Sequence, residues 1–311
     1  MSLPLVSVIM SCYNEKSEWI RLCIDSILNQ SYKNIEFIII CDNPNNIELV
    51  NLLCKYKHNS KVKIIFNNKN IGLTKSLNIG LKNSKGNYIA RMDADDISYG
   101  DRIEKQVNYI KNTNVDFVMG RVNFIDENGL DITNKKSSVL KDDCMLKQCL
   151  KYGNVSIHPT WMFKREILNQ LVKYNDVSYA EDYDFLCRAI INGYKVKYMD
   201  DYLVKYRVRK SGITKSKRAY QEINSQIISK NYKKALKDSK KYNVKQDIKK
   251  IKKKSIEEFL LNHERFQVAK KQIKSKKIIR GTVNAINILI KSKFKRIQVY
   301  NYIMKSICLL R

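Results

Sequence analysis

The 311-residue sequence contains little of what breaks regular structure. It has three prolines and ten glycines, and it also has few tryptophans (two) and histidines (three). The low content of glycine and proline excludes collagen-like and low-complexity chains. No run of 18 apolar residues occurs, so we expect no transmembrane helix. Because no basic segment precedes an apolar run at the start, we also expect no secretory signal peptide.

The eight cysteines form no C-x-x-C pair, which argues against zinc ribbons and thioredoxin-like motifs. Most of them lie inside apolar runs, where a free cysteine behaves as a small buried hydrophobic residue. Disulfides form mainly in oxidising compartments, so reduced and buried thiols are typical of the cytosol. We therefore expect a cytoplasmic protein.

Basic residues far outnumber acidic ones, with 59 Lys and Arg against 30 Asp and Glu and a net charge of +29. A charge of this size predicts an anionic partner, such as a nucleic acid, a membrane surface or a phosphorylated substrate. Residues 215–311 hold 28 of the basic and 6 of the acidic residues, so they carry +22, whereas residues 1–214 carry +7. The excess of charge is thus mostly a property of the last third of the chain.

Strand-like and helix-like patterns alternate over the first 100 residues. Continuous apolar runs predict strands buried on both faces at 5–10, 35–41, 62–66 and 88–92. Apolar residues at helical spacing predict helices between them at 17–29, 47–56 and 73–81. This alternation predicts an α/β fold with a mostly parallel, Rossmann-like sheet. Hydrophobic residues make up 44% of the chain, which is enough for the core of such a domain.

Beyond residue 100 the pattern is mixed rather than alternating. Helical spacing predicts helices at 102–111, 142–151 and 182–192. Strand-like runs occur at 115–126, 158–164 and 195–209. From residue 215 onward the pattern is helical and rich in lysine. We therefore expect an α+β second half followed by a helical C-terminal region.

Polar residues follow each of the first four predicted strands, where ligands bind in parallel sheets. The strongest signal is Asp93-Ala94-Asp95-Asp96, in which three carboxylates follow a buried strand. Such charges repel one another unless a cation neutralises them, and carboxylate oxygens suit Mg²⁺ or Mn²⁺. The structural alternative is a solvated acidic turn that caps the next helix.

Several segments in order give this signal a context. Residues 6–15 (VSVIMSCYNE), 26–32 (SILNQSY), 70–80 (NIGLTKSLNIG) and 85–96 (KGNYIARMDADD), with Asp42 after the second strand, resemble the family 2 glycosyltransferases. The resemblance covers roughly residues 5–210. It predicts a glycosyltransferase domain over 1–214 and leaves the Lys-rich helical region over 215–311 outside it.

The resemblance implies a GT-A fold that transfers a sugar from a nucleotide-sugar to an acceptor hydroxyl, with inversion at the anomeric carbon. It also implies that Asp95 is the direct ligand of a Mn²⁺ or Mg²⁺ ion that bridges to the diphosphate, and that Asp93 reaches the ribose or the metal. The physical fit is good, because a cation stabilises the charge that develops on a departing nucleoside diphosphate.

The same resemblance implies a nucleotide-sugar site around the ends of the first three strands. Tyr13 would lie against the base, with Glu15 in the same motif, and Asn70 would hold the nucleoside. Asp42 would accept a hydrogen bond from a base N–H, most often that of uracil. The structural alternatives are a core aromatic for Tyr13 and a turn-initiating side chain for Asp42.

Glu181 and Asp182 stand at the start of the predicted helix 182–192. Acidic residues at a helix N-terminus cap it and match its dipole, which is the structural explanation. The pair also resembles the Glu-Asp motif of the family, which implies that Asp182 is the general base for the acceptor hydroxyl. Glu181 would orient or assist it.

Two further segments resemble parts of the family's motifs, and three residues near the predicted nucleotide site differ from them. His158-Pro159-Thr160 resembles a His-Pro element of some relatives, in which His158 would touch the metal or the acceptor; a structural histidine is the alternative. Residues 206–212 (YRVRKSG) resemble the closing loop, so Arg207 and Arg209 would clamp the diphosphate, although many relatives have His at position 209. Ser11, Cys12 and Leu77 depart from the usual motif residues. Lys75 or Arg91 would then supply the contact to the diphosphate or the nucleoside that the usual motif residues make.

Three interpretations of residues 215–311 stay open. The region forms a helical appendage packed on the catalytic domain or on a second copy of the chain, as in a homo-oligomer. Alternatively it anchors the protein to an anionic membrane surface, or it binds nucleic acid, although no nucleic-acid-binding motif accompanies it. Apolar residues from Val283 to Ile307 recur every three or four positions, which predicts one helical stripe about 25 residues long.

Together with the acidic motifs, the resemblance implies a metal-dependent, inverting hexosyltransferase that uses a nucleotide-sugar, with UDP the expected nucleotide. The acceptor would be a hydroxyl of a glycan or lipid-linked glycan in surface polysaccharide synthesis, at the inner face of the cell membrane. The alternative is a catalytically inactive, basic binding protein for membrane or nucleic acid on the same scaffold. The intact acidic motifs argue against that loss of catalysis.

Overall fold

The computed structural model describes residues 3–136, 140, 142–209, 215–238, 241–251, 253–275 and 278–310. The chain divides into two compact units. Unit 1 comprises Met1–Leu146, Val155–Asp176 and Arg188–Lys210, and unit 2 comprises Lys147–Asn154, Val177–Cys187 and Ser211–Arg311. Unit 2 therefore contains the Lys-rich region and also two short segments from within residues 1–214.

Unit 1 is built around a mixed sheet whose described strands number nine. Along the chain they are β1 Val6–Cys12, β2 Ile35–Cys41, β3 Val62–Phe66, β4 Tyr88–Asp93, β5 Ile97–Ser98, β6 Phe117–Ile125, β7 Asp131–Lys136, β8 Met162–Lys164 and β9 Val196–Arg207. Their order in the sheet is β3-β2-β1-β4-β8-β6-β9-β5, with β7 paired to β6. The first four predicted strands are thus confirmed as neighbours.

Strands β3, β2, β1 and β4 are parallel to one another, and β6 is parallel to β9. The short strand β8 runs antiparallel to both β4 and β6 and joins the two halves of the sheet. The predicted α/β fold with a parallel sheet is confirmed. The antiparallel strand β8 lies within the predicted run 158–164, whose first residues form a 3₁₀ turn, η1 His158–Thr160, instead of a strand.

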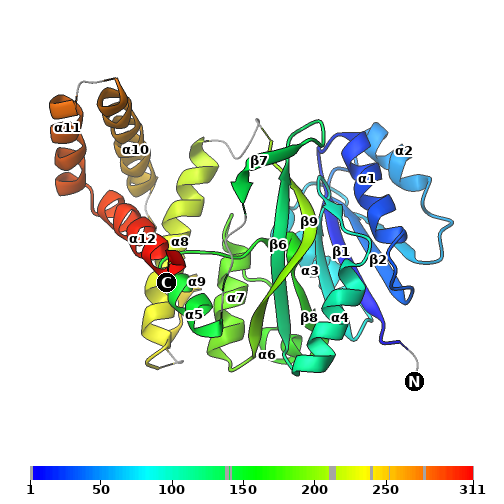
Figure 1. Ribbon diagram of the computed structural model, residues 1–311. Helices are drawn as coiled ribbons and strands as arrows, with labels where there is room; N and C mark the ends of the chain where they lie inside the picture. Colours follow the sequence, from blue (N-terminus) through cyan, green and yellow to red (C-terminus); the bar gives the residue numbers. More distant parts are fainter. Residues whose placement is uncertain are drawn as a thin grey trace. The chain divides into compact units, whose positions relative to one another are not determined.

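Helices cover both faces of the parallel strands. Helices α1 Ser17–Leu28, α2 Ile47–Cys54 and α4 Arg102–Thr113 bury apolar residues against alternate strand positions such as Val8 and Met10. Helix α3 Leu73–Asn83 packs on β1 and β2 from the other face. Figure 1 shows α1 and α4 in front of the sheet and α3 behind it. Because strand side chains alternate between faces, continuous apolar runs fill both layers.

Shorter helices lie in the second half. They are α5 Asp143–Leu150, η2 Arg165–Ile167, α6 Leu168–Leu171 and α7 Glu181–Ile191. The unit boundary falls within both α5 and α7. The first turn of α7, with the predicted Glu-Asp pair, belongs to unit 2.

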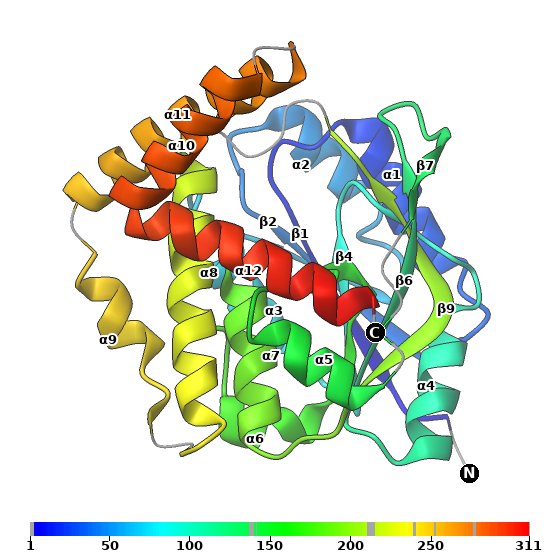
Figure 2. The same cartoon turned by 60° about the vertical axis from the view of Figure 1, so that its left-hand side comes forward.

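Unit 2 is helical, as predicted from its sequence pattern. Its remaining helices are α8 Lys215–Ala235, α9 Val244–Lys249, α10 Lys253–Lys274, α11 Ile278–Lys291 and α12 Lys293–Leu310. Figure 2 shows α10 and α11 side by side and α12 alongside α8, in agreement with their contacts. Among the described residues, no helix is both long and apolar enough to cross a membrane.

The prediction of one continuous helical stripe from Val283 to Ile307 is wrong. The helix breaks at Ser292, between α11 and α12. Ser292 Oγ accepts a hydrogen bond from the backbone N–H of Lys295 at 3.3 Å, which caps the start of α12. The Arg296 guanidinium donates to the carbonyls of Leu289 and Ile290, which satisfies the end of α11. Both new helix ends are therefore stabilised by side chains.

Candidate functional site

The carboxyl ends of the four parallel strands meet at one edge of the sheet in unit 1. Cys12 is in register with Cys41, which is in register with Phe66, and Ser11 is in register with Asp93. The segments that follow these strands therefore start next to one another. This arrangement gathers the predicted nucleotide residues and the acidic turn at one edge, as the sequence predicted.

Asp42 is buried and holds the loop after β3 in place. Its Oδ1 accepts from Asn67 Nδ2 at 2.8 Å and from the Ile71 N–H at 2.9 Å, and its Oδ2 accepts from the Gly72 N–H at 2.9 Å. Gly72 takes a φ of +87°, which favours glycine, immediately before α3. A carboxylate has about four acceptor sites, so these three bonds leave one for a ligand.

The other predicted nucleotide residues of this edge reach the surface. Tyr13 is 41% exposed, and its backbone N–H donates to Glu15 Oε2 at 2.7 Å. Asn70 is exposed and accepts from the Gly72 N–H through Oδ1 at 3.0 Å. Lys75 is exposed in the first turn of α3. An aromatic ring, an amide and an ammonium group are thus available to a ligand beside the buried Asp42.

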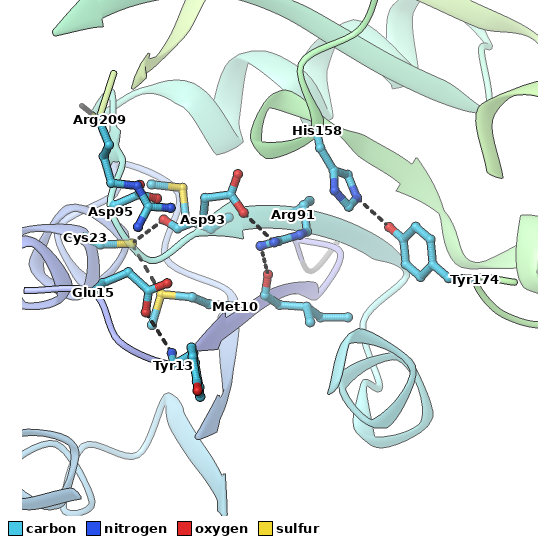
Figure 3. Close-up of polar contacts among 12 residues, drawn as sticks. Met10, Tyr13, Glu15, Cys23, Arg91, Asp93, Asp95, His158, Tyr174 and Arg209 are labelled. Carbon is cyan, nitrogen blue, oxygen red and sulfur yellow. Dashed lines mark hydrogen bonds and ion pairs between the residues drawn. The ribbon is translucent and has the colours of Figure 1, made fainter. Parts of the chain in front are cut away.

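The acidic turn after β4 is balanced by two arginines (Figure 3). Arg91 Nη2 lies 2.5 Å from Asp93 Oδ1, and Arg209 Nε lies 2.9 Å from Asp95 Oδ2. Burial, and then the charge of Asp93, raise the pKa of Asp95 to about 6 from an ordinary 3.8, although Arg209 acts in the opposite direction. Asp95 is thus held in a site where its negative charge is costly without a further cation.

Asp96 lies deeper than the other two carboxylates. It is fully buried, and burial and the charges of Asp95 and Asp93 raise its pKa well above the ordinary value. Its Oδ1 accepts from the Arg207 backbone N–H at 2.7 Å, while its buried Oδ2 has no hydrogen-bond partner among the residues that the structure describes. Asp96 therefore ties the acidic turn to the end of β9.

Arg207, predicted as a diphosphate clamp, is buried inside unit 1. Its Nε donates to the Asp95 carbonyl at 2.8 Å, and Nη1 donates to the carbonyls of Asp126 and Glu127. The guanidinium also lies over the Trp19 ring, 4.9 Å from its centroid. These contacts hold the backbone of the acidic turn. Arg209, with a 38% exposed side chain, is the arginine of this segment that reaches the surface.

The structure does not assemble the predicted ligand set of Asp93, Asp95 and His158. His158 Nε2 lies 2.9 Å from the Tyr174 hydroxyl, and its ring packs edge-on against Trp161. Figure 3 shows the ring pointing to Tyr174. Burial, and then Arg91, lower the pKa of His158 well below its ordinary value. Over the described ranges, no three His, Cys, Asp or Glu side chains are arranged to hold one metal ion.

Two carboxylates remain suited to a divalent cation. Asp93 and Asp95 repel one another, and Glu15 adds to the negative charge around Asp95. Mg²⁺ in phosphate-binding sites is commonly held by one or two carboxylates together with substrate phosphates, so a third protein ligand is not required. The residues present at the turn therefore fit such an ion.

The predicted catalytic pair lies in unit 2, at the start of α7. Glu181 is buried, and Asp182 is half-buried. Asp182 Oδ2 accepts from Asn154 Nδ2 at 2.7 Å, and Oδ1 accepts from the Tyr183 N–H at 2.7 Å. Acidic residues fill the first turn of the helix, so they also match its dipole.

Asp182 opens onto a cavity of about 390 Å³ that lies wholly within unit 2. The cavity is lined by α7 and its neighbours and by α8 and α12. The lining side chains are rich in amides, hydroxyls and aromatic rings, and they include Tyr152, Asn154, Tyr179, Gln221, Ser225, Gln298, Asn301, Tyr302 and Lys305. Pockets of this size bind small molecules, and convergent polar groups give them their specificity.

Three residues around these sites were not singled out from the sequence. Asn154 holds Asp182, Asn67 holds Asp42, and Gln226 lines the cavity. Asn67 stands in the polar cluster after β3, so its position was a usable signal. Asn154 and Gln226 carried no local signal, because each becomes relevant only through residues far away in the sequence.

Comparison with known proteins gives one consistent family. The family model described as Glycosyl transferase family 2 matches residues 7–172. The uncharacterized glycosyltransferase MJ1057 of Methanocaldococcus jannaschii is 38% identical over 214 residues, which cover 67% of this chain and 72% of that protein. The O-antigen biosynthesis glycosyltransferase WbnJ of Escherichia coli is 32% identical over 227 residues, or 72% of this chain and 87% of WbnJ.

A third relative and a solved structure agree with these matches. The amylovoran biosynthesis glycosyltransferase AmsE of Erwinia amylovora is 29% identical over 226 residues, which cover 72% of this chain and 83% of AmsE. The crystal structure of S. aureus TarS 1-349 in complex with UDP-GlcNAc has a TM-score of 0.59 and 16% identity, and covers 94% of this chain and 90% of that chain. At that identity the likeness concerns the fold.

Proposed function

Because the chain belongs to glycosyl transferase family 2, we propose that it moves a sugar from a UDP-sugar to a hydroxyl group of a glycan, with inversion at the anomeric carbon. The relatives named for O-antigen and amylovoran biosynthesis support a glycan product at the cell surface. The fold likeness to TarS, crystallised with UDP-GlcNAc, supports a nucleotide-sugar donor.

The donor would bind at the carboxyl edge of the parallel strands in unit 1. Tyr13 offers a ring for the base, and the remaining acceptor site of Asp42 suits a base N–H. Asn70 and Lys75 are exposed beside them. Arg209 would pair with the diphosphate, since its guanidinium reaches the surface at the acidic turn.

Asp95 and Asp93 would hold a Mn²⁺ or Mg²⁺ ion at the same edge. Such an ion, when bound, neutralises the charge of the diphosphate leaving group. Arg91 already pairs with Asp93 and Arg209 with Asp95, so the carboxylates are kept in place by the protein itself. The raised pKa of Asp95 supports the proposal, because a nearby cation would relieve the cost of its charge.

Asp182 would act as the general base, and its position on the 390 Å³ cavity is the observation that carries this assignment. An acceptor sugar in the cavity would give a hydroxyl proton to Asp182 while its oxygen bonds to the anomeric carbon. The bond from that carbon to the diphosphate breaks with its electron pair, and a single displacement inverts the configuration. Asn154 orients the carboxylate for this step, and the buried Glu181 stands next to it.

We further propose that the protein works in the cytoplasm at the inner face of the membrane, on a lipid-linked glycan. Four apolar side chains, Ile279, Val283, Ile286 and Ile290, recur on one face of α11 and are each at least half exposed. Arg280 and Lys291 are the basic residues of the same helix, and an apolar face on a basic helix is typical of helices that lie on anionic membranes. Self-association through the same face is the competing explanation.

Thermal stabilisation by UDP and Mn²⁺ tests the enzyme assignment, and Asp182→Asn tests the base. We expect a rise in melting temperature with UDP plus Mn²⁺ in both proteins, but transfer about 10²- to 10⁴-fold slower in the variant, as for loss of a general base. Asp176→Asn, at an exposed carboxylate, is the matched control and should behave as the wild type. No stabilisation by UDP, GDP or dTDP, with or without metal, would favour the inactive binding protein.

The metal assignment has its own test in Asp95→Asn. We expect the variant to lose the part of the UDP stabilisation that depends on Mn²⁺, while the part seen in EDTA remains. The Asp176→Asn control should keep both parts. An unchanged Mn²⁺ titration in Asp95→Asn would remove Asp95 from the metal site.

A further inference from the structure

A second cavity of unit 2 is lined by apolar side chains and by four lysines. It has a volume of about 560 Å³ and lies between α8 and α12. Its surface is largely apolar, and it is lined by Ile227, Phe294, Ile297 and Tyr300 together with the side chains of Lys230, Lys233, Lys234 and Lys293. The described residues that line it include no Asp or Glu. We call this cavity the lysine groove.

Lys233 is the most informative residue of the lysine groove. It is half-buried, and its Nζ lies 4.4 Å from the ring centroid of Tyr152 and 5.9 Å from that of Tyr300. No carboxylate of the described residues forms an ion pair with it. Burial, and then the charge of Lys151, lower its pKa. The Lys233 ammonium group is thus partly removed from water and lies beside aromatic rings, with no counter-ion among the described residues.

The lysine groove adjoins the cavity that contains Asp182. Gln226 and Asn301 line both cavities. Gln226 Nε2 donates to the Phe294 carbonyl at 3.0 Å, while its buried Oε1 has no hydrogen-bond partner within the described part of the chain. The two cavities are therefore neighbours along α8 and α12, with the side chains of Gln226 and Asn301 as their common wall.

We propose that the lysine groove binds the phosphate-bearing lipid end of the acceptor. The proposal rests on the proposed function, which places the acceptor glycan in the adjoining cavity. Four lysines with no acidic residue among the described lining residues match a phosphate or diphosphate, and the apolar side chains match the first part of a hydrocarbon chain. Neither a free phosphate nor a neutral lipid would use both parts of the groove.

Calorimetric titration of the full-length protein with farnesyl diphosphate tests this proposal, because the probe carries both a diphosphate and a short apolar chain. Farnesol and inorganic diphosphate are the probes that lack one part each. We expect farnesyl diphosphate to bind at least about tenfold more tightly than either, since both the charge and the chain contribute. Equal affinity for inorganic diphosphate and farnesyl diphosphate would overturn the proposal.

Variants of the groove identify the binding site. In Lys230→Gln/Lys233→Gln the affinity for farnesyl diphosphate should fall by about tenfold or more. Lys254→Gln/Lys271→Gln removes the same charge from exposed positions of α10 and should leave it unchanged. Ile297→Ser should weaken the binding of farnesyl diphosphate but not the binding of inorganic diphosphate. Unchanged affinity in the double groove variant would overturn the proposal.

Two measurements distinguish this proposal from the proposed donor site and from binding to a membrane surface. The stabilisation by UDP and Mn²⁺ should persist in the groove variants, so failure of the donor assignment is seen independently of lipid binding. Sedimentation with vesicles of phosphatidylglycerol and phosphatidylcholine tests the membrane surface as the occupant. If the groove variants lose vesicle binding while farnesyl diphosphate fails to bind the wild type, the groove is a membrane contact and the proposal is wrong.

Discussion

The side-chain amide of Asn154 donates a hydrogen bond to Asp182 Oδ2 over 2.7 Å, and both residues line one cavity of unit 2. The two residues are 28 positions apart in the sequence. The bond fixes the orientation of the carboxylate and stabilises its charged form. It makes Asn154 a positioning residue for the proposed base.

Replacing Asn154 by alanine should slow transfer without weakening donor binding. We expect kcat to fall by about 10- to 100-fold, because one hydrogen bond to a charged group contributes about 1.5–3 kcal/mol. Loss of the donor should also raise the pKa of Asp182, so the acid limb of the pH–rate profile should move to higher pH. Asn262→Ala, at an exposed amide on α10, is the control. A lower kcat with an unshifted profile would contradict this role.

Asp42→Asn should loosen the loop before α3 and weaken UDP binding. The asparagine can still accept through one oxygen, but its amide nitrogen cannot accept from the Gly72 N–H. We expect the free energy of unfolding to fall by about 1 kcal/mol, as for the loss of one hydrogen bond, because Asn70 Oδ1 still accepts from the Gly72 N–H. Urea denaturation measures the first effect and UDP titration the second. Full UDP affinity in a folded variant would exclude Asp42 from the nucleotide site.

Gly86→Ala should destabilise unit 1 for a steric reason. A Cβ at Gly86 would lie 2.5 Å from the Ser7 backbone nitrogen and 2.8 Å from the Leu5 carbonyl oxygen, both at the start of β1. Backbone atoms cannot move aside as a side chain does, so we expect a loss of about 1–3 kcal/mol. Gly100→Ala is the matched control, because its Cβ would meet nothing within 4 Å. Chemical denaturation of both variants gives the comparison.

Because of Lys295, the stability of the protein should vary with pH in the alkaline range. Burial lowers its pKa to about 8 from 10.5, although Glu222 acts in the opposite direction and Lys270 in the same one. Between these two values the unfolded chain binds more protons than the folded one, so stability rises with pH across this window. Relative to Lys295→Met, the wild type should gain stability from pH 7 to pH 10. A constant difference would contradict the lowered pKa.

The parallel half of the sheet and the site at its edge were predictable because their signals are local. Buried parallel strands read as apolar runs, and the residues directly after them must meet where the strands are adjacent. Tyr13, Asp42 and the Asp93–Asp96 turn were therefore placed together from the sequence. The roles of single residues were harder to predict from the sequence. Arg207, predicted to clamp the diphosphate, is buried under the acidic turn, and His158, predicted to touch the metal or the acceptor, pairs with Tyr174.

The sequence by itself thus determined the α/β fold, the family and the order of the acidic motifs, because periodicity and motif spacing are properties of neighbouring residues. Tertiary structure alone decided what surrounds Asp182. Its cavity is lined by Asn154 from before α7, by Gln221 and Ser225 from α8 and by Lys305 from α12. These residues lie up to about 150 positions apart, and chain folding alone brings them together. Part of the Lys-rich region, which first suggested only an affinity for anions, forms the wall of the proposed acceptor site.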